Sequence, residues 1–426
     1  MPNERRAVGG PVALSILSAY FGVALAAWIA AGVAAIVAAP DLAAGDPLAS
    51  APVLAVHLVA LGALPLAVSG ASFHLLPVML RNDLPSQRML WVALPLLCCG
   101  PLVALGVASG LVAAVWLGAG AVTCGLAIVL WELLSLVARA PSGRTLITSR
   151  VGVTLACGHV VVALCLGAVI FSEDSPFGGL SYPRWLLIHL HAALLGWVAM
   201  LVVTVGRNLA PMLALAPAAP RRRLPLDEAA LAVALWLLLA GIGTRERALT
   251  LAGGVAIVLV LARFAAFLVR TARTRRAALE APLAHLLAGA WFFAQAAGVG
   301  LAAAAGAGGT RLVCAYVALL LVGWAGGVVL GHVPKLLSLS VWVWWPPGPR
   351  PKQGELYRRR LGVFEALAFV VGVEAFAVGI AAGSAWLARA GAVVFLVSTL
   401  LTAAGVVATR RQRDVMLRSA LARNIA

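Results

Sequence analysis

The stretch VHLVALGALPLAVSGASFHLLPVML, residues 56–80, decides the fold, because it is a long apolar run that still contains two histidines. A bilayer core about 30 Å thick needs roughly 20 apolar residues per helix, so this run is long enough to cross a membrane. Runs this uniform lack the alternation of a lipid-facing barrel strand, and backbone groups in lipid must be satisfied within the segment. The stretch therefore predicts a transmembrane helix.

The rest of the chain has the same character. Its 426 residues are 63% hydrophobic and only 11% charged, with mean hydropathy +1.02, which is far outside the range of a soluble globular domain. We expect a single all-α transmembrane domain in contact with the lipid bilayer. Twelve spans are predicted, near 11–39, 50–80, 88–110, 113–138, 147–171, 184–215, 226–243, 248–270, 282–304, 311–341, 361–383 and 390–409. The third and fourth runs adjoin and the seventh is short, so eleven or thirteen helices also fit.

The basic residues predict the orientation. The net charge is +17, but Lys and Arg lie in alternate connections rather than on one soluble face, which argues against a nucleic-acid partner. They gather at the amino terminus, near 81–88, 139–150, 221–223, 270–276 and 350–360, and after Arg410. The opposite connections hold only Arg184, Arg245, Arg247, Arg311 and Arg389. By the positive-inside rule both termini face the cytoplasm, with 410–426 as a basic tail, and we expect a bacterial inner membrane.

An internal repeat organises these spans. Residues 190–213 read LHAALLGWVAMLVVTVGRNLAPML, and superposing His191 on His57 also superposes Gly196 on Gly62 and Pro211 on Pro77. A third copy places Gly323 at the glycine position, but Ala318 replaces the histidine. The spans that carry the copies are four helices apart. The sequence therefore predicts three four-helix units, near 11–138, 147–270 and 282–409, around a pseudo-threefold axis.

All seven histidines fall in or at the edge of predicted spans, where an ionisable side chain is costly and tends to face a cavity, a bundle interior or a ligand. His57 and His191 each lie about 10 Å below the outer surface. Two residues are about 200° around a helix, so His189 and His191 point to opposite sides. Imidazole is a good ligand for haem iron and for copper. Hydrogen bonding to a neighbouring helix is the alternative for any one of them.

Three more histidines, His74, His285 and His332, lie toward the cytoplasmic side. They fit a second site, a proton relay or simple interfacial residues. Among the intramembrane acids Glu132, Glu365 and Glu374, the last is deepest, and we predict it as a proton-conducting or cation-pairing group. A neutral carboxyl bonded to a helix fits equally well.

At this point the chain resembles the haem-copper oxidase catalytic subunits and their divergent relatives, including membrane haem-copper proteins linked to nitric-oxide metabolism. That family also arranges three four-helix units around a pseudo-threefold axis. His57 matches the helix-two histidine that ligates low-spin haem, and the stretch 73–80 resembles the end of the family's helix two. His189 and His191, followed by Gly196, resemble the HxHxxxxxG signature of two haem ligands, and Gly331, His332 and Lys335 resemble a GHxxK motif of oxidase-like membrane proteins.

The departures from the family are also specific. The signature lies on span six instead of helix ten, where this chain offers only Cys314 and Tyr316. Span seven has no histidine, so the usual copper-binding pair is absent, and no HxxxY or HxxxE pattern surrounds a copper-binding histidine. The resemblance therefore implies an oxidoreductase of this type without the usual copper site.

We accordingly predict a haem-binding membrane redox protein. His57 and His191 would hold haem b near the outer face, and His159 and His189 would be available for copper or a second haem. The protein would transfer electrons from a cytochrome or another redox subunit, or bind or reduce a small diatomic molecule such as nitric oxide. Two rivals remain. Internal repeats also describe secondary transporters, and the missing third histidine fits a cofactor-free membrane anchor subunit of a redox complex.

Overall fold

A computed structural model describes residues 12–141, 146–171, 182–217, 225–346 and 350–425 of the chain. The basic residues of the amino terminus, Arg144 and Arg221 to Arg223 lie outside these ranges. Within them the chain is helical, without a β-strand, and twelve helices are long and apolar enough to cross a membrane. The predicted number of spans is therefore confirmed. Exposed side chains such as Leu117 and Trp131 give the bundle an apolar surface for lipid.

Eight spans are single helices. They are α1 (Leu14–Ala44), α6 (Val112–Arg139), α7 (Ile147–Phe171), α10 (Leu226–Thr244), α11 (Arg247–Arg273), α12 (Ala281–Ala304), α17 (Arg359–Ala382) and α18 (Ala385–Ile425). Span three consists of α4 (Gln87–Leu97) and α5 (Gly100–Ser109). It is separated from α6 by Gly110, whose left-handed φ of 73° ends the helix, so the adjoining third and fourth runs are two spans. The predicted tail 410–426 continues α18 as helix to Ile425.

The three spans that carry the aligned histidine or alanine have a different backbone. Each is interrupted by a π-helical segment, in which the hydrogen-bonding ring is one residue wider than in an α-helix. Span two is α2 (Ser50–His57), η1 (Leu58–Ala63) and α3 (Leu64–Leu80); span six is α8 (Tyr182–His191), η2 (Ala192–Ala199) and α9 (Met200–Ala214). Span ten is α13 (Thr310–Val317), η3 (Ala318–Gly326), α14 (Gly327–Leu330) and α15 (Val333–Val343). The π segments contain Gly62, Gly196 and Gly323, the three aligned glycines.

The helices pair in a recurring order. α1 packs on η1, α7 on η2 and α12 on η3, while the next two spans pair as α5 with α6, α10 with α11 and α17 with α18. Contacts of α6 with α7, α11 with α12 and α18 with α1 connect these groups into a closed ring. The segment η3 contacts both η1 and η2, so the π segments lie toward the middle of the ring.

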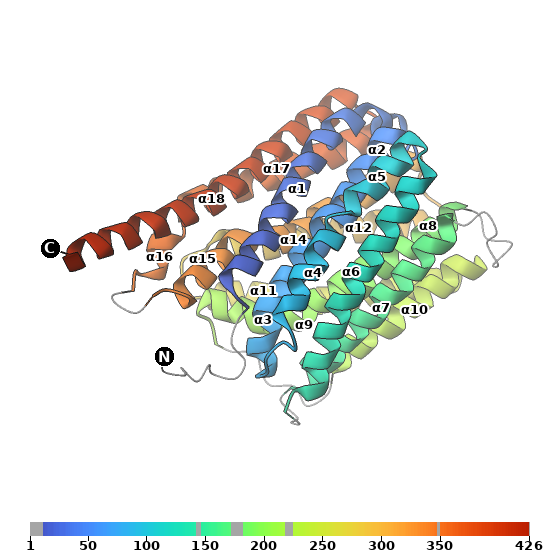
Figure 1. The fold of residues 1–426 in the computed structure, drawn as a ribbon. Coiled ribbons are helices and arrows are strands. Elements are labelled where there is room, and N and C mark those ends of the chain that lie inside the picture. Colours follow the sequence, from blue (N-terminus) through green and yellow to red (C-terminus); the bar gives the residue numbers. More distant parts are fainter. Residues whose placement is uncertain (1–11, 142–145, 172–181, 218–224, 347–349, 426) are drawn as a thin grey trace.

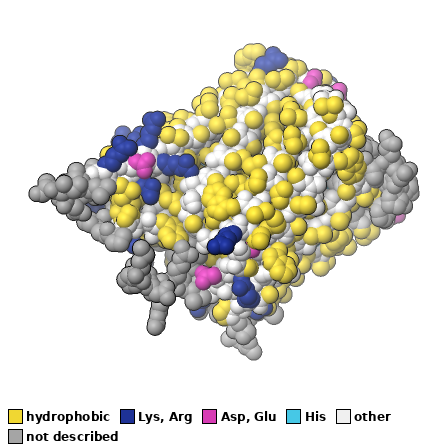
Figure 2. Space-filling view, viewed as in Figure 1, with side chains coloured by type: hydrophobic (Ala, Val, Ile, Leu, Met, Phe, Trp, Pro, Cys, Tyr) yellow, Lys and Arg dark blue, Asp and Glu magenta, His cyan; other side chains and the backbone are white. Residues whose placement is uncertain are grey.

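Both ends of the chain lie at the same end of the bundle, where α1 begins and α18 extends beyond the other helices (Figure 1). We call it the terminal end. On the face drawn in Figure 2, most Lys and Arg side chains gather there, and hydrophobic side chains cover the middle of the bundle. This distribution agrees with the charge pattern of the sequence. The cytoplasmic location of the terminal end stays a prediction.

Candidate histidine sites

His57 and His191 occupy the same place in their spans, as the last residue before η1 and η2. In each, Nδ1 lies close to the carbonyl oxygen four residues earlier, at 2.8 Å from Val53 and at 2.7 Å from Leu187. A carbonyl can only accept, so Nδ1 carries the hydrogen and Nε2 keeps the lone pair. Both rings are therefore held in the tautomer that a metal or haem ligand needs.

The two histidines of span six face different neighbours. Nε2 of His191 lies 2.7 Å from the hydroxyl of Tyr316 on α13, and the hydroxyl donates, because Nδ1 already carries the ring hydrogen. Nδ1 of His189 donates instead to the carbonyl of Ala163 on α7, at 2.9 Å. The pair thus reaches two different helices. Of the predicted haem ligands, His191 points to span ten, whereas the only hydrogen bond described for His57 is to Val53 in its own helix.

His159 on α7 contacts the aligned glycine of span six. A Cβ at Gly196 would lie 2.6 Å from the Cβ of His159, so only glycine allows this approach. Ala27 and Phe292 occupy the corresponding positions against Gly62 and Gly323. The ring of His159 is buried, and its Nδ1 donates to Leu155 at 2.7 Å. Its buried Nε2 has no hydrogen-bond partner among the described residues.

The expected second metal has less support. Among the described residues no group of three or more His, Cys, Asp or Glu side chains is arranged to hold a metal ion. His159 and His189, the predicted copper ligands, are therefore not joined there by a third such ligand. Each still presents Nε2 with its lone pair, because Nδ1 is bonded to a carbonyl.

The inner histidines are buried within the bundle, since His74, His285 and His332 are 3%, 2% and 5% exposed. Nδ1 of His74 lies 3.0 Å from the hydroxyl of Ser340, so this ring connects span two to span ten. The expectation that these histidines lie at the membrane interface stays a prediction, because burial in the bundle does not give their depth in the membrane.

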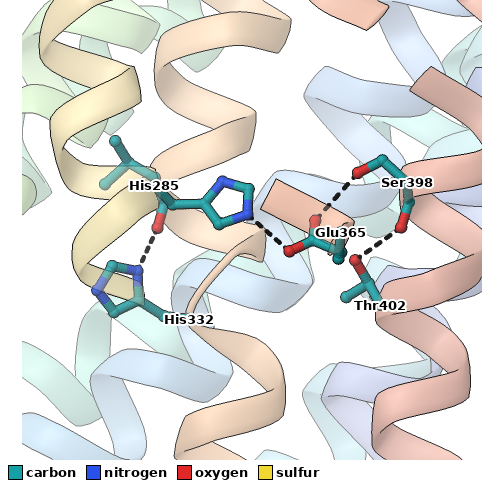
Figure 3. Close-up of polar contacts among 6 residues, drawn as sticks. His285, His332, Glu365, Ser398 and Thr402 are labelled. Atoms are coloured by element: carbon teal, nitrogen blue, oxygen red, sulfur yellow. Dashed lines mark hydrogen bonds and ion pairs between the residues drawn. The ribbon is translucent and has the colours of Figure 1, made fainter. Parts of the chain in front are cut away.

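His285 on α12 forms a buried pair with Glu365 on α17 (Figure 3). Nε2 of the imidazole lies 2.8 Å from one carboxyl oxygen, Oε2, and the hydroxyl of Ser398 on α18 donates to the other at 3.0 Å. Nδ1 of His285 is buried and has no partner within the described part of the chain. Three helices thus meet at one carboxyl group, which lies within hydrogen-bonding distance of an imidazole and a hydroxyl group.

His332 lies beside this pair, at the start of α15. Its Nδ1 donates to Val328 at 2.6 Å, and its buried Nε2 has no partner among described residues. In Figure 3 this nitrogen points away from His285 and Glu365. His332 also lines a cavity of about 80 Å³ between spans two, six, nine and ten, whose walls are otherwise apolar apart from Ser72.

A glycine and a lysine shape this inner region. A Cβ at Gly331 would clash with the ring of His285, which explains the glycine before His332. Lys335, the lysine of the GHxxK pattern, is buried, and its Nζ lies 2.8 Å from Oε2 of Glu280. Its ammonium group lies 4.9 Å from the ring centre of Tyr357. Burial, with the neighbouring carboxylates of Glu280 and Glu365, raises the pKa of Tyr357.

Glu374, the acid predicted for proton conduction, lies elsewhere. Its Oε2 accepts from the amide of Gln295 at 2.9 Å and from the indole of Trp291 at 3.3 Å. The side chain is half-buried, whereas Glu365 is 5% exposed. The sequence placed both acids in one span, but it held no signal that Glu365 would meet His285, which is 80 residues away.

The comparisons with known proteins assign no family. No family model matches the chain, and no curated protein matches it. A functional proposal must therefore rest on the residues and the geometry described above.

Proposed function

We propose that this chain is a haem-binding membrane redox protein, similar to a haem-copper oxidase catalytic subunit that lacks the usual copper site. His57 and His191 are the predicted axial ligands of haem b. The protein would transfer electrons, or bind or reduce a small diatomic molecule such as nitric oxide. A cytochrome or another redox subunit would supply the electrons, and both termini would lie in the cytoplasm of a bacterial inner membrane.

One observation carries the proposal: His57 and His191 have the same fixed tautomer at the same place before a π segment. A neutral imidazole with Nδ1 bonded to a carbonyl presents Nε2 to iron and cannot rotate freely. π segments are also found frequently at functional sites. Two such imidazoles on two corresponding helices are more than a packing role requires.

The helix arrangement supports the threefold plan that the resemblance implies. Three four-helix units are expected to show three π segments, each packed on the preceding span. They are also expected to show three equivalent contacts around a closed ring, and both features are present. The unit-specific residues then stand out. His159 replaces Ala27 and Phe292 at the glycine contact, and Tyr316 contacts His191 from the unit that has no aligned histidine.

The donor set fits a haem better than a copper ion. The buried and unpartnered Nε2 of His159 is the kind of atom that a bound group would satisfy, and the fixed imidazoles supply the nitrogen ligands. No third protein ligand for copper joins His159 and His189 in the described residues. When bound, haem would supply one-electron chemistry. The chain's own residues would orient the imidazoles and exclude water, and Tyr316 would release His191 for ligation.

The two histidines of span six have different partners, since His189 is hydrogen-bonded to Ala163 and His191 to Tyr316. The ligand opposite His57 is therefore tested by comparing the two histidines of span six directly. The proposal predicts that one of them is essential to the haem band and the other is not.

Reduced-minus-oxidised spectra of purified wild type and of His57→Ala, His189→Ala and His191→Ala provide the test. We expect a b-type haem band in wild type, and its loss in His57→Ala and His191→Ala. His74→Ala is the matched control, because His74 is a buried histidine of the same span as His57. A band that survives all three outer substitutions would refute the ligand assignment. Haem-free protein that takes up a substrate into liposomes would favour the transporter instead.

A further inference from the structure

We propose that Glu365, His285 and His332 form a proton-exchange route between the terminal end and the cavity among spans two, six, nine and ten. Glu280, Lys335 and Tyr357 form its entrance. The route uses none of the predicted haem ligands and does not rest on the haem proposal. It also assigns the proton-conducting role to Glu365 instead of Glu374.

Glu280 and Tyr357 of the entrance lie just outside the apolar spans, and Lys335 lies within span ten. The carboxylate of Glu280 immediately precedes α12, is 24% exposed and holds the ammonium group of Lys335 at 2.8 Å. Lys335 in turn lies over the ring of Tyr357. Because burial and the carboxylates of Glu280 and Glu365 raise the pKa of Tyr357, its phenol keeps its proton at neutral pH. Tyr357 therefore lies in the entrance as a neutral phenol beside the ammonium group of Lys335.

Glu365 is the next group on the route. The hydroxyl of Tyr357 lies against Gly362, about one turn before Glu365 on α17. The carboxyl group is held at one oxygen by Ser398 and at the other by His285 (Figure 3). A proton between Oε2 and Nε2 can reside on either atom, because carboxylate and imidazole both accept it. A hydrogen bond that only holds two helices together does not need two atoms that can each take the proton.

His285 and His332 carry the route onward. Gly331 lets the ring of His285 lie directly against the backbone before His332, and the two imidazoles interact electrostatically. Nδ1 of His285 and Nε2 of His332 are both buried without a partner in the described residues. A purely structural pair would have these nitrogens bonded, since buried polar groups nearly always are. Bound water can bond each nitrogen, and because Nε2 of His332 points away from His285, a chain of more than one water would be needed to link them (Figure 3).

The cavity provides room for that water. A water molecule needs roughly 10–15 Å³ of such space and two to four polar partners, so the cavity of about 80 Å³ has room for water beside Ser72 and His332, its polar lining side chains. A proton that reaches Nε2 of His332 is thereby delivered to this cavity.

Infrared difference spectroscopy of the purified full chain tests the route without requiring haem, so a haem-free preparation serves equally well. We expect a protonated carboxyl band that exchanges hydrogen for deuterium. Glu365→Gln should remove it, while Glu374→Gln retains it as the matched control. Ser398→Ala keeps the carboxyl group and removes one hydrogen bond, so it should shift the band, which covers the case that Glu365→Gln does not fold.

The entrance is tested by exchange rates in the same experiment. Lys335→Met and Glu280→Gln should slow deuterium exchange of the Glu365 band severalfold without removing the band. A band that Glu365→Gln leaves in place, or that Ser398→Ala leaves unshifted, would overturn the assignment to Glu365. Unchanged exchange in both entrance variants would overturn the route, and neither result would bear on whether His57 and His191 bind haem.

Discussion

His57 and His191 before the π segments, and His159 at the middle of α7, are each held by a carbonyl group of their own helix, whereas His285 is held by the carboxyl group of Glu365 on another helix. A carbonyl can only accept, so the first arrangement keeps the hydrogen on Nδ1 and leaves the lone pair of Nε2 for a ligand. A carboxyl group can also take up or give a proton, so the second arrangement permits proton transfer. The same residue type is thus held in two different ways, which fit the two proposed roles.

The largest effect on stability is expected from Glu365→Ala, which breaks the carboxyl-centred region. Removing one partner of a buried pair leaves the other uncompensated and costs about 3–5 kcal/mol. Glu374→Ala is the control, because Glu374 is half-buried and is bonded to a neutral amide and an indole. Unfolding in mixed detergent micelles measures the difference. Equal losses in the two variants would show that the pair with His285 has no special weight.

Two glycine variants sharpen the comparison, because each displaces one histidine ring. Gly196→Ala places a methyl group against His159, and Gly331→Ala places one against His285. Overpacking of this kind costs about 1–3 kcal/mol. Gly298→Ala is the control, since a Cβ there meets nothing within 4 Å. Both variants should unfold at a lower temperature than the control. A variant that unfolds at the same temperature as Gly298→Ala would show that its histidine ring can move away from the added methyl group.

Hydropathy alone predicted the spans, because their apolar runs are long and the breaks between them carry charges or glycine. The opposite directions of His189 and His191 also followed from helical geometry. The pairing of His285 with Glu365 and of His191 with Tyr316 did not, because these partners are 80 and 125 residues apart in the chain. The π segments left no local signal either, since their apolar sequences suit an α-helix equally well. For this reason the sequence favours Glu374 over Glu365 as the proton-conducting group.

Tyr316→Phe probes the carbonyl-held region with a smaller effect. It removes the hydroxyl that donates to Nε2 of His191, and a lost hydrogen bond of this kind costs about 1 kcal/mol. If His191 ligates haem, the loss appears in haem-free protein and largely disappears in haem-loaded protein, where iron takes the nitrogen. Parallel unfolding of both preparations measures it. An equal loss in both would argue that His191 is not a ligand.

The smallest effect concerns Tyr357 and appears only at alkaline pH. Since burial and two carboxylates raise the pKa of Tyr357 in the folded protein, the unfolded chain ionises first, near pH 10. Stability contributed by the protonated phenol is present below about pH 10 and declines above it, by at most about 1.4 kcal/mol per pH unit. Tyr357→Phe should flatten this decline in pH-dependent unfolding. Identical alkaline profiles would contradict the burial of the phenol.

The most direct test of the central claim is the haem content of purified wild type, measured as pyridine haemochrome beside that of His57→Ala and His74→Ala. The account predicts haem b in fixed stoichiometry with the chain in wild type and in His74→Ala, and none in His57→Ala. Folded wild-type protein that contains no haem after expression with ample haem supply would contradict it.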